Sequence, residues 1–559
     1  MKSIFRKKRN IFVEPDEIFL DSTNLPQFDT QQFEGRIEHP IPKINIKLVG
    51  IITFIIFISF GIKLSALQIN QGEKFLEQSR NNSLDHEPLF ADRGIIYDRN
   101  GTELSWNEKS SIDQPFSIRK YISEGGFGHL LGYVSYPTKD KTGYYWQSEF
   151  IGKDGVEKVY DDILHGKNGV RIIEKDVAGN VLSHNIVNEP VQGNNVTLTI
   201  DSRIQGIFSK ELQNVIDSGG YSGGSALMMD VRNGEILMMT SYPEYKPEIV
   251  SLGDDSKTIG EYFTDSRKPF LNRALQGLYS PGSIVKPFMA IAALTEGVVD
   301  ENTQILSRGS ISIPNPYNPK LSSVFKDLAD DNGWVDVRNA LKVSSNIYFY
   351  EIGGGYKNQR GIGILNIEKY ARSFGLDEKT GINFPGEKEG VIPSPEWKEK
   401  NFPGDPWRIG DTYHTVIGQY GFQVTPIEML RAVSSIANSG TLYTPHFLQG
   451  ESNNPVKLPY DEHYFKVVQE GMHLVATVGT GRTLSQLPFS LGVKTGTAEV
   501  GILKNKINSW MMGFFPYENP KYAFVINLER GPSDVGVNVR SVAINSFTFL
   551  YSIMPEFFQ

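Results

Sequence analysis

One apolar run near the N-terminus constrains the fold of this chain more than any other feature. Residues 48–62 contain no charged side chain, and after Lys63 the apolar character continues to Ile69. At about 1.5 Å per residue, residues 48–69 cross a hydrocarbon core of roughly 30 Å if the Lys63 side chain reaches the interface. The alternatives are a buried core helix and a cleaved signal peptide, but no A-x-A cleavage site follows the run. We therefore expect one membrane-spanning helix over residues 47–69.

The distribution of positive charge predicts how this helix is oriented. The first ten residues, MKSIFRKKRN, contain five lysines and arginines and no acid. Positive charge favours the cytoplasmic side of a membrane, whereas the charges next to the run discriminate little. We expect residues 1–46 to form a cytoplasmic tail of a single-pass protein in the cell (inner) membrane. Everything after Ile69 then lies outside the cytoplasm.

The composition excludes several classes of protein. Lys plus Arg total 56 against 64 for Asp plus Glu, a formal net charge of -8, so a generally basic nucleic-acid binder is excluded. The chain has no cysteine, which excludes disulfides, cysteine nucleophiles, thiolate zinc sites and iron–sulfur clusters. Its 559 residues leave room for several domains.

The exported part divides into two regions by pattern. Residues 70–200 contain short β-prone runs separated by turn signals, which predicts a strand-rich, non-catalytic region that we call the pedestal. From residue 201 onward, helical and strand patterns alternate. The clearest is a hairpin in which two apolar runs, residues 225–231 and 236–241, flank an Asn-Gly turn.

The second region, residues 201–559, mixes helices with strands that follow one another closely. We therefore expect an α+β domain in which helices flank a largely antiparallel sheet. The expected helices cover residues 284–297, 364–376 and 425–440, and the expected neighbouring strands cover residues 509–516 and 522–529.

Common catalytic signatures are absent from the sequence. It contains no H-E-x-x-H, no G-x-x-x-x-G-K-[ST] and no G-x-S-x-G. Metallohydrolases, P-loop enzymes and α/β-hydrolases are therefore poor candidates.

A serine and a lysine three residues apart form the first candidate motif. In YSPGSIVKP, Ser283 follows a Pro-Gly turn at the start of an apolar helical pattern, and Lys286 follows one turn later. This spacing brings both side chains to one face of a helix. A lysine activates a serine hydroxyl only when burial or a neighbouring cation lowers its pKa. Taken alone, the pattern also fits a capping serine with a surface lysine.

Two further short motifs follow in the same region. Ser344 and Asn346 stand in ALKVSSNIYFY, and the run K-T-G-T occupies residues 494–497. A strand that carries lysine and threonine, with Gly496 allowing close approach, can hold a carboxylate. Each motif is common by chance, and their order within one predicted domain makes the combination specific.

The combination resembles the motifs of the penicillin-recognising serine transpeptidases, S-x-x-K, S-x-N and K-T-G. The chain looks most like a membrane-anchored class B penicillin-binding protein of the elongation type called penicillin-binding protein 2. The likeness runs from about Leu64 onward and includes ADRGIIYDRNG, IGKDGVEKVYDDILHGKNG and GDTYHTVIGQYGFQVTPIEML. It implies a dimerisation-type pedestal and a penicillin-binding transpeptidase domain.

The resemblance also implies a role for each motif residue. Ser283 resembles the acylated nucleophile, Lys286 the general base, and Ser344 the relay of protons toward the leaving amine. Asn346 resembles the residue that binds the substrate amide, and the backbone N–H groups of Ser283 and Thr497 would form the oxyanion hole. The remaining substrate-binding residues implied are Lys494, Thr495, Gly496 and Thr497.

The implied reaction is the cross-linking of peptidoglycan stem peptides through an acyl-enzyme on Ser283, inhibited by β-lactams and serving cell elongation. No cofactor is implied. The implied partners are stem peptides, β-lactam antibiotics, the lipid bilayer, a membrane glycan polymerase and the cell-elongation machinery, with no nucleic acid.

The sequence departs from the family pattern at three places. Some elongation-type members carry a metal-binding insertion with a cysteine between the first two motifs, whereas residues 325–346 here contain neither Cys nor His. We therefore predict no zinc. The second motif has Asn346 where some elongation-type members have aspartate, and Tyr420 interrupts the usual G-Q-G run.

Two other functions stay open. A D,D-carboxypeptidase or β-lactamase would pass the same acyl group to water, although the anchor and the pedestal speak against a β-lactamase. A non-catalytic β-lactam sensor or scaffold could keep the fold without cross-linking, but residues 1–46 contain no recognisable signalling element.

Overall fold

The computed structural model divides into two compact units. One contains residues 1–85 and 174–182, and the other contains residues 86–173 and 183–559. Most of the expected cytoplasmic tail lies outside the described residues. The structure describes residues 42–75, 84–109, 114–175, 180–315, 318–451, 453–501, 505–533 and 536–559.

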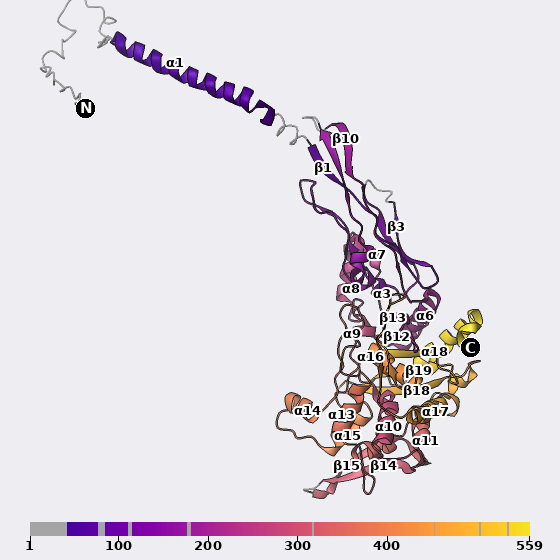
Figure 1. The fold of residues 1–559 in the computed structure, drawn as a ribbon. Coiled ribbons are helices and arrows are strands. Elements are labelled where there is room, and N and C mark those ends of the chain that lie inside the picture. Colours follow the sequence, from indigo (N-terminus) through magenta and orange to yellow (C-terminus); the bar gives the residue numbers. More distant parts are fainter. Residues whose placement is uncertain are drawn as a thin grey trace, which may run out of the picture. The chain divides into compact units, whose positions relative to one another are not determined.

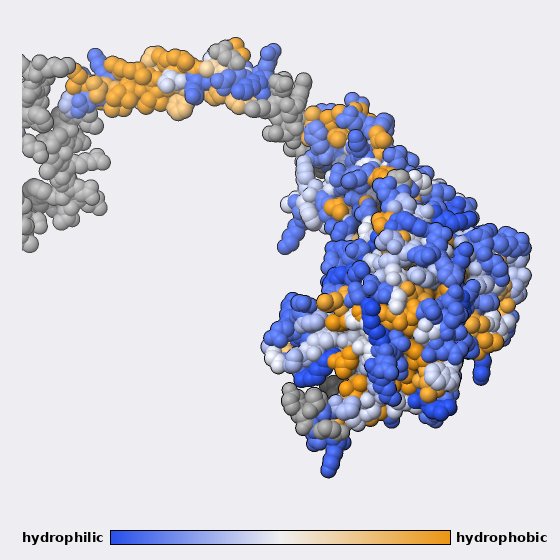
Figure 2. All heavy atoms as spheres, turned by 60° about the horizontal axis from the view of Figure 1, so that its bottom comes forward, coloured by the Kyte–Doolittle hydropathy of each residue, from blue (hydrophilic) through white to orange (hydrophobic). Residues whose placement is uncertain are grey.

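The first long element is the apolar helix α1 (Lys43–Ser65), which continues into the π-helical turn η2 (Ala66–Asn70) (Figure 1). None of the residues of α1 is buried against other parts of the protein, and hydrophobic side chains cover its middle, with hydrophilic ones toward both ends (Figure 2). Within the described residues, Lys43–Ile69 is the one helix long and apolar enough to cross a membrane. A helix that is apolar on all sides suits a lipid environment, so the long apolar helix expected near the N-terminus is present, and its length and composition fit a membrane span.

The pedestal is rich in short strands, as expected. Its four-stranded sheet has the order β11-β2-β3-β4, formed by β2 (Ile96–Tyr97), β3 (Glu103–Glu108), β4 (Ile118–Tyr121) and β11 (Val196–Thr197). The other elements are β1 (Leu84–Leu89), α3 (Gly128–Leu131), β5 (Val134–Ser135), β6 (Thr138–Lys139), β7 (Tyr145–Gln147), β8 (Ile151–Gly152), α4 (Gly155–Val159), α5 (Asp161–Leu164), β9 (Gly169–Lys175) and β10 (Val181–Asn188).

A five-stranded antiparallel sheet organises the rest of the chain. Its order is β13-β12-β20-β19-β18. Both the expected hairpin, with Gly234 in its turn at φ 88°, and the expected neighbouring strands near the C-terminus are present. The strands are β12 (Gly223–Asp230), β13 (Ile236–Tyr242), β18 (Gly492–Val500), β19 (Lys506–Phe515) and β20 (Tyr522–Pro532).

Both faces of this sheet are buried. Side chains alternate along each strand, so neighbouring residues point to opposite faces. On β12, Leu227 and Met229 join one hydrophobic cluster, whereas Ala226 and Met228 join the other. This explains why β12 reads as a continuous apolar run rather than as an alternation of apolar and polar residues.

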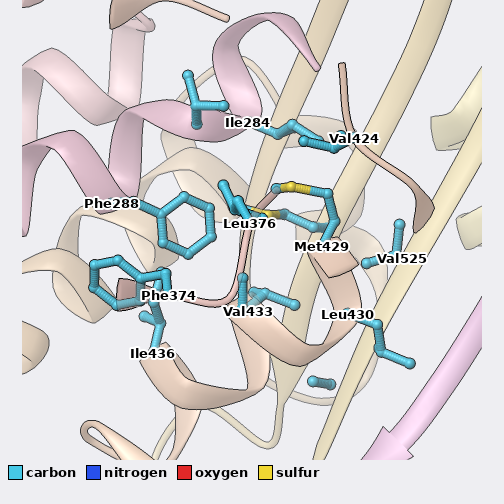
Figure 3. Close-up of a cluster of buried hydrophobic side chains, with 14 of the residues drawn as sticks. Ile284, Phe288, Phe374, Leu376, Val424, Met429, Leu430, Val433, Ile436 and Val525 are labelled. Atoms are coloured by element: carbon cyan, nitrogen blue, oxygen red, sulfur yellow. The ribbon is translucent and has the colours of Figure 1, made fainter. Parts of the chain in front are cut away.

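Helices cover each face of the sheet. The first cluster contains α10 (Lys286–Thr295), α13 (Ile364–Ser373) and α16 (Pro426–Ala437), which correspond to the three expected helices. Phe288 of α10 packs against Phe374 with ring centroids 5.0 Å apart (Figure 3). The opposite face packs against α6 (Ser202–Gly219) and α18 (Val539–Ile553). The expected α+β class is confirmed, and the exact domain boundaries stay a prediction.

The elements not yet named include a long hairpin between the first two motifs. It consists of β14 (Ile305–Asn315) and β15 (Asn318–Val335), paired antiparallel with register shifts near Arg308. The remaining elements are α7 (Pro247–Leu252), α8 (Ser256–Thr264), α9 (Arg273–Gln276), η3 (Gly282–Val285), α11 (Val337–Val343), α12 (Asn346–Gly354), α14 (Pro395–Asn401), α15 (Ile409–Val416), β16 (Thr441–Leu442), β17 (Val456–Lys457), α17 (Glu462–Val478), η4 (Arg482–Gln486) and η5 (Pro555–Phe558).

Candidate active site

The first motif lies on a tight turn rather than on a regular helix. Ser283 belongs to the 3₁₀ turn η3, and α10 begins at Lys286. Gly282 has φ 58°, and a Cβ there would lie 2.8 Å from the backbone oxygen of Thr497. Only glycine therefore allows the turn to approach β18 so closely. The indole of Trp510 on β19 donates a hydrogen bond to the Ser280 carbonyl at 3.0 Å, which fixes the residues before the turn.

The second motif joins two helices. Ser344 ends α11 in the left-handed conformation, with φ 59°. The next residue, Ser345, caps α12 and accepts a hydrogen bond from the backbone N–H of Tyr348 at 3.0 Å. This change of direction places Ser344 and Asn346 on either side of a capped helix start.

The third motif lies on β18, the edge strand of the sheet. Lys494 is fully buried, whereas Thr497 is exposed. The hydroxyl of Thr495 is 2.9 Å from the hydroxyl of Thr480. A Cβ at Gly496 would lie 2.9 Å from the carbonyl oxygen of Pro281, so this glycine allows the strand to pass directly beside the turn that carries the first motif.

The three motifs meet at Ser344. Lys286 Nζ donates to the Ser344 carbonyl at 2.7 Å and to Asn346 Oδ1 at 2.8 Å, and it lies 3.4 Å from Ser344 Oγ. Lys494 Nζ donates to Ser344 Oγ at 2.9 Å. No hydrogen bond joins Ser283 Oγ to Lys286 Nζ in the part of the chain that the structure describes. The structure thus brings the predicted residues together, with Lys286 bonded to the second motif instead of to Ser283.

Burial changes the protonation of both lysines. Burial and the charge of Lys494 together lower the pKa of Lys286 well below its usual value, and Asp327 partly opposes them. Burial lowers the pKa of Lys494 to about 7. A lysine at the floor of this site is therefore available as a neutral amine near neutral pH, which a surface lysine is not.

A pocket of about 1020 Å³ lies above this floor. Ser283, half-buried, contributes to its wall, whereas neither buried lysine reaches it. Its lining includes Ser283, Phe325, Ser344, Asn346, His414, Tyr420, Thr480, Thr495, Gly496, Thr497, Trp510 and Arg540.

Several residues of this pocket were not predicted as site residues. Thr480 lies in the connection between α17 and η4, and Arg540 lies in the first turn of α18, both without a recognisable motif. The Arg540 guanidinium donates to the Thr480 carbonyl at 3.3 Å. Tyr420 could be noticed in the sequence, because it interrupts the G-Q-G run of the family. Its backbone has φ 62°, and its ring lies between Trp397 and Trp407, with ring centroids 5.9 Å and 5.8 Å away. The departure from G-Q-G therefore adds one aromatic side chain to the pocket lining.

The described residues contain no group of three or more His, Cys, Asp or Glu side chains that could hold a metal ion. The expectation of a zinc-free site stays a prediction.

Comparison with known proteins decides the family. Residues 224–544 match the penicillin binding protein transpeptidase domain. The chain belongs to this family. Residues 114–198 of this penicillin-binding protein match the dimerisation domain of the same kind of protein, and this match falls within the pedestal.

Named relatives agree with that assignment. The peptidoglycan D,D-transpeptidase MrdA of Acinetobacter baumannii is 32% identical over 74% of this chain and 63% of its own length. MrdA of Escherichia coli K12 is 30% identical over 76% of this chain and 70% of its own length. The structure of PBP2 in its complex with MreC from Helicobacter pylori has a TM-score of 0.69 and 26% identity, covering 84% of this chain and 99% of that one.

These matches confirm the resemblance to class B penicillin-binding proteins of the PBP2 type. They also confirm the predicted enzyme class, a peptidoglycan D,D-transpeptidase of the elongation type. An apolar helix near the N-terminus fits the membrane anchor expected for such an enzyme.

Proposed function

We propose that this penicillin-binding protein cross-links stem peptides by two acyl transfers through Ser283. In the first, Ser283 Oγ bonds to the penultimate D-alanyl carbonyl carbon, the peptide bond breaks, and terminal D-alanine leaves with the hydroxyl proton. In the second, an amine of a neighbouring stem bonds to the same carbon. The ester bond then breaks, and a proton returns to Ser283.

One observation carries this proposal: two buried lysines converge on Ser344 beneath the pocket that Ser283 lines. Because its pKa is lowered, Lys286 can accept the proton of Ser283, three residues away along η3 and α10. Ser344 Oγ, 3.4 Å from Lys286 Nζ, can then pass a proton to the leaving amine. Lys494 holds the Ser344 hydroxyl in place from the other side.

The open edge of β18 suits a peptide substrate. Strand β18 is last in the order of the sheet, and among the described residues no other strand pairs with its outer edge. An extended stem peptide can add there as a further strand. Its terminal carboxylate would then meet the hydroxyls of Thr495 and Thr497, and its amide would meet Asn346. A β-lactam has the same acidic and acyl groups and would acylate Ser283.

The pH dependence of acylation follows from the two lysines. Lys286 acts as a base only when neutral, and Lys494 attracts a carboxylate only when protonated. We expect the second-order rate constant for acylation to rise with pH as Lys286 loses its proton and to fall above about pH 7 as Lys494 loses its own. Stopped-flow measurement with a fluorescent penicillin would record this bell-shaped profile.

Lys494→Arg provides the control for this profile. Arginine keeps its charge at all these pH values, so the alkaline limb of the variant should move to higher pH while the acidic limb stays in place. A wild-type profile without an alkaline limb would contradict the assignment of Lys494.

Product analysis separates cross-linking from hydrolysis. The full-length enzyme is reconstituted in vesicles with a glycan polymerase and lipid-linked precursor, and the digested product is resolved by mass spectrometry. We expect cross-linked dimers with the wild type and none with Ser283→Ala. Shortened stems without dimers would instead identify a D,D-carboxypeptidase, and covalent penicillin labelling without either product would identify a sensor.

The remaining parts of the proposal concern location and partners. Positive charge in residues 1–46 supports a cytoplasmic N-terminus in the cell (inner) membrane, with the catalytic domain outside. The complex of Helicobacter pylori PBP2 with MreC supports binding to elongation proteins in this chain too. A membrane glycan polymerase would supply the strands that are cross-linked.

A further inference from the structure

A carboxylate outside the three motifs lies next to the second one. Asp327, half-buried on β15, accepts a hydrogen bond at Oδ1 from the backbone N–H of Asn346 at 2.7 Å and another from that of Leu328 at 2.8 Å. At Oδ2 it accepts from Ser307 Oγ at 2.5 Å, Ser345 Oγ at 3.0 Å and Asn332 Nδ2 at 3.3 Å. Five donors therefore converge on one carboxylate.

This carboxylate completes the start of α12. Asn346 is the first residue of that helix, and its N–H has no partner within the helix. Negative charge at this position is favourable because the N-terminus of a helix is positive. Ser345 is fully buried, and its hydroxyl donates to Asp327, accepts from the backbone N–H of Tyr348 and lies 2.8 Å from the hydroxyl of Ser307.

The same contact fixes the side chain that binds Lys286. The amide nitrogen of Asn346 donates to the Lys326 carbonyl at 3.4 Å, while its Oδ1 accepts from Lys286 at 2.8 Å. Asn346 is thus held by β15 through its backbone and side chain, and it holds Lys286 in turn.

We propose that Asp327 is a positioning residue of the catalytic site, acting through Asn346 on Lys286. Asp327 lies in residues 325–346, the stretch that has neither Cys nor His. Its hydrogen bonds connect the β14–β15 hairpin to the second motif. The inference rests on the proposed function of Lys286 as the general base.

The charge of Asp327 adds an electrostatic contribution. Two charged groups act on Lys286, namely Lys494 from β18 and Asp327 from β15. Lys494 lowers the pKa of Lys286 and Asp327 raises it. Removing the negative charge should therefore lower the pKa of Lys286 further, so that the base becomes neutral at lower pH.

Asp327→Asn tests the inference, because asparagine keeps the shape but removes the charge and one acceptor. We expect the acylation rate constant of the full-length enzyme to fall by about tenfold to a hundredfold, since charge-assisted hydrogen bonds are lost. We also expect the acidic limb of its pH profile to move to lower pH. The matched control is Asp330→Asn, an exposed carboxylate on the same strand, which should change neither.

Further variants distinguish positioning from folding. Ser307→Ala removes one donor to Asp327 without touching a motif, and we expect a smaller fall in rate with a small fall in melting temperature, since one buried hydroxyl is lost. Asp327→Glu, which restores the charge, should return the acidic limb toward its wild-type position.

Two results would overturn the inference: an Asp327→Asn rate constant equal to that of the wild type, or a slower variant whose acidic limb does not move. Failure of the proposed function is recognised separately, because the wild type itself would then form no label dependent on Ser283.

Discussion

Replacing Ser283 with alanine is expected to abolish covalent labelling by a fluorescent penicillin. The ester needs the Ser283 oxygen, and no neighbouring hydroxyl can replace it at that position on η3. In the described part of the chain, the Ser283 side chain makes no hydrogen bond and is half-buried, so its loss should cost little stability. Gel fluorescence of the full-length protein in detergent measures the label, and thermal unfolding checks the fold.

Ser280→Ala is the matched control. Ser280 precedes the same turn, and the hydrogen bond from Trp510 involves its backbone carbonyl, which alanine keeps. This variant should label as the wild type does. Undiminished labelling of Ser283→Ala would refute the assignment of the nucleophile.

Lys286→Met is expected to lower the acylation rate constant by about a hundredfold to ten-thousandfold, the range for losing a general base. Methionine is unbranched like lysine and one heavy atom shorter, and it suits the fully buried position. The substitution leaves Asn346 Oδ1 and the Ser344 carbonyl without their donor, which costs about 1–3 kcal/mol for each group. Removing a buried amine offsets part of that loss, so the variant should still fold.

Rapid-mixing kinetics at several penicillin concentrations would separate the acylation step from binding. Lys342→Met serves as the control, because Lys342 lies on α11 near the second motif and bonds to Asn339 instead. A rate constant for Lys286→Met within a few-fold of the wild-type value would show that another group takes the proton.

Much of the fold could be predicted because its signals are local. The Asn-Gly turn at residues 233–234 and the apolar runs beside it specify a hairpin whatever surrounds them. The unbroken apolar run after residue 47 likewise has few possible structures other than a membrane helix. The site residues were predictable in the same way, because the three short motifs and their order along the chain indicate which residues form the site.

Tertiary contacts explain what could not be predicted. The pattern after Ser283 indicates an α-helix, yet η3 is a 3₁₀ turn because Gly282 must pass beside Thr497. Strand β15 has a polar sequence that no periodicity marks, and it forms by pairing with β14. The contact of Asp327 with Asn346 depends on that pairing, so no motif revealed it.

The two buried lysines of this site, Lys286 and Lys494, also affect the stability of the folded enzyme. In the unfolded chain both Lys286 and Lys494 hold protons at neutral pH, whereas the folded protein binds them less tightly. The unfolded state therefore carries more protons. As a result, the free energy of unfolding rises with pH until the pH reaches the ordinary pKa of lysine. Replacing either lysine with an apolar residue would remove its contribution to this dependence of stability on pH, and at Lys286 it would also remove the proposed general base.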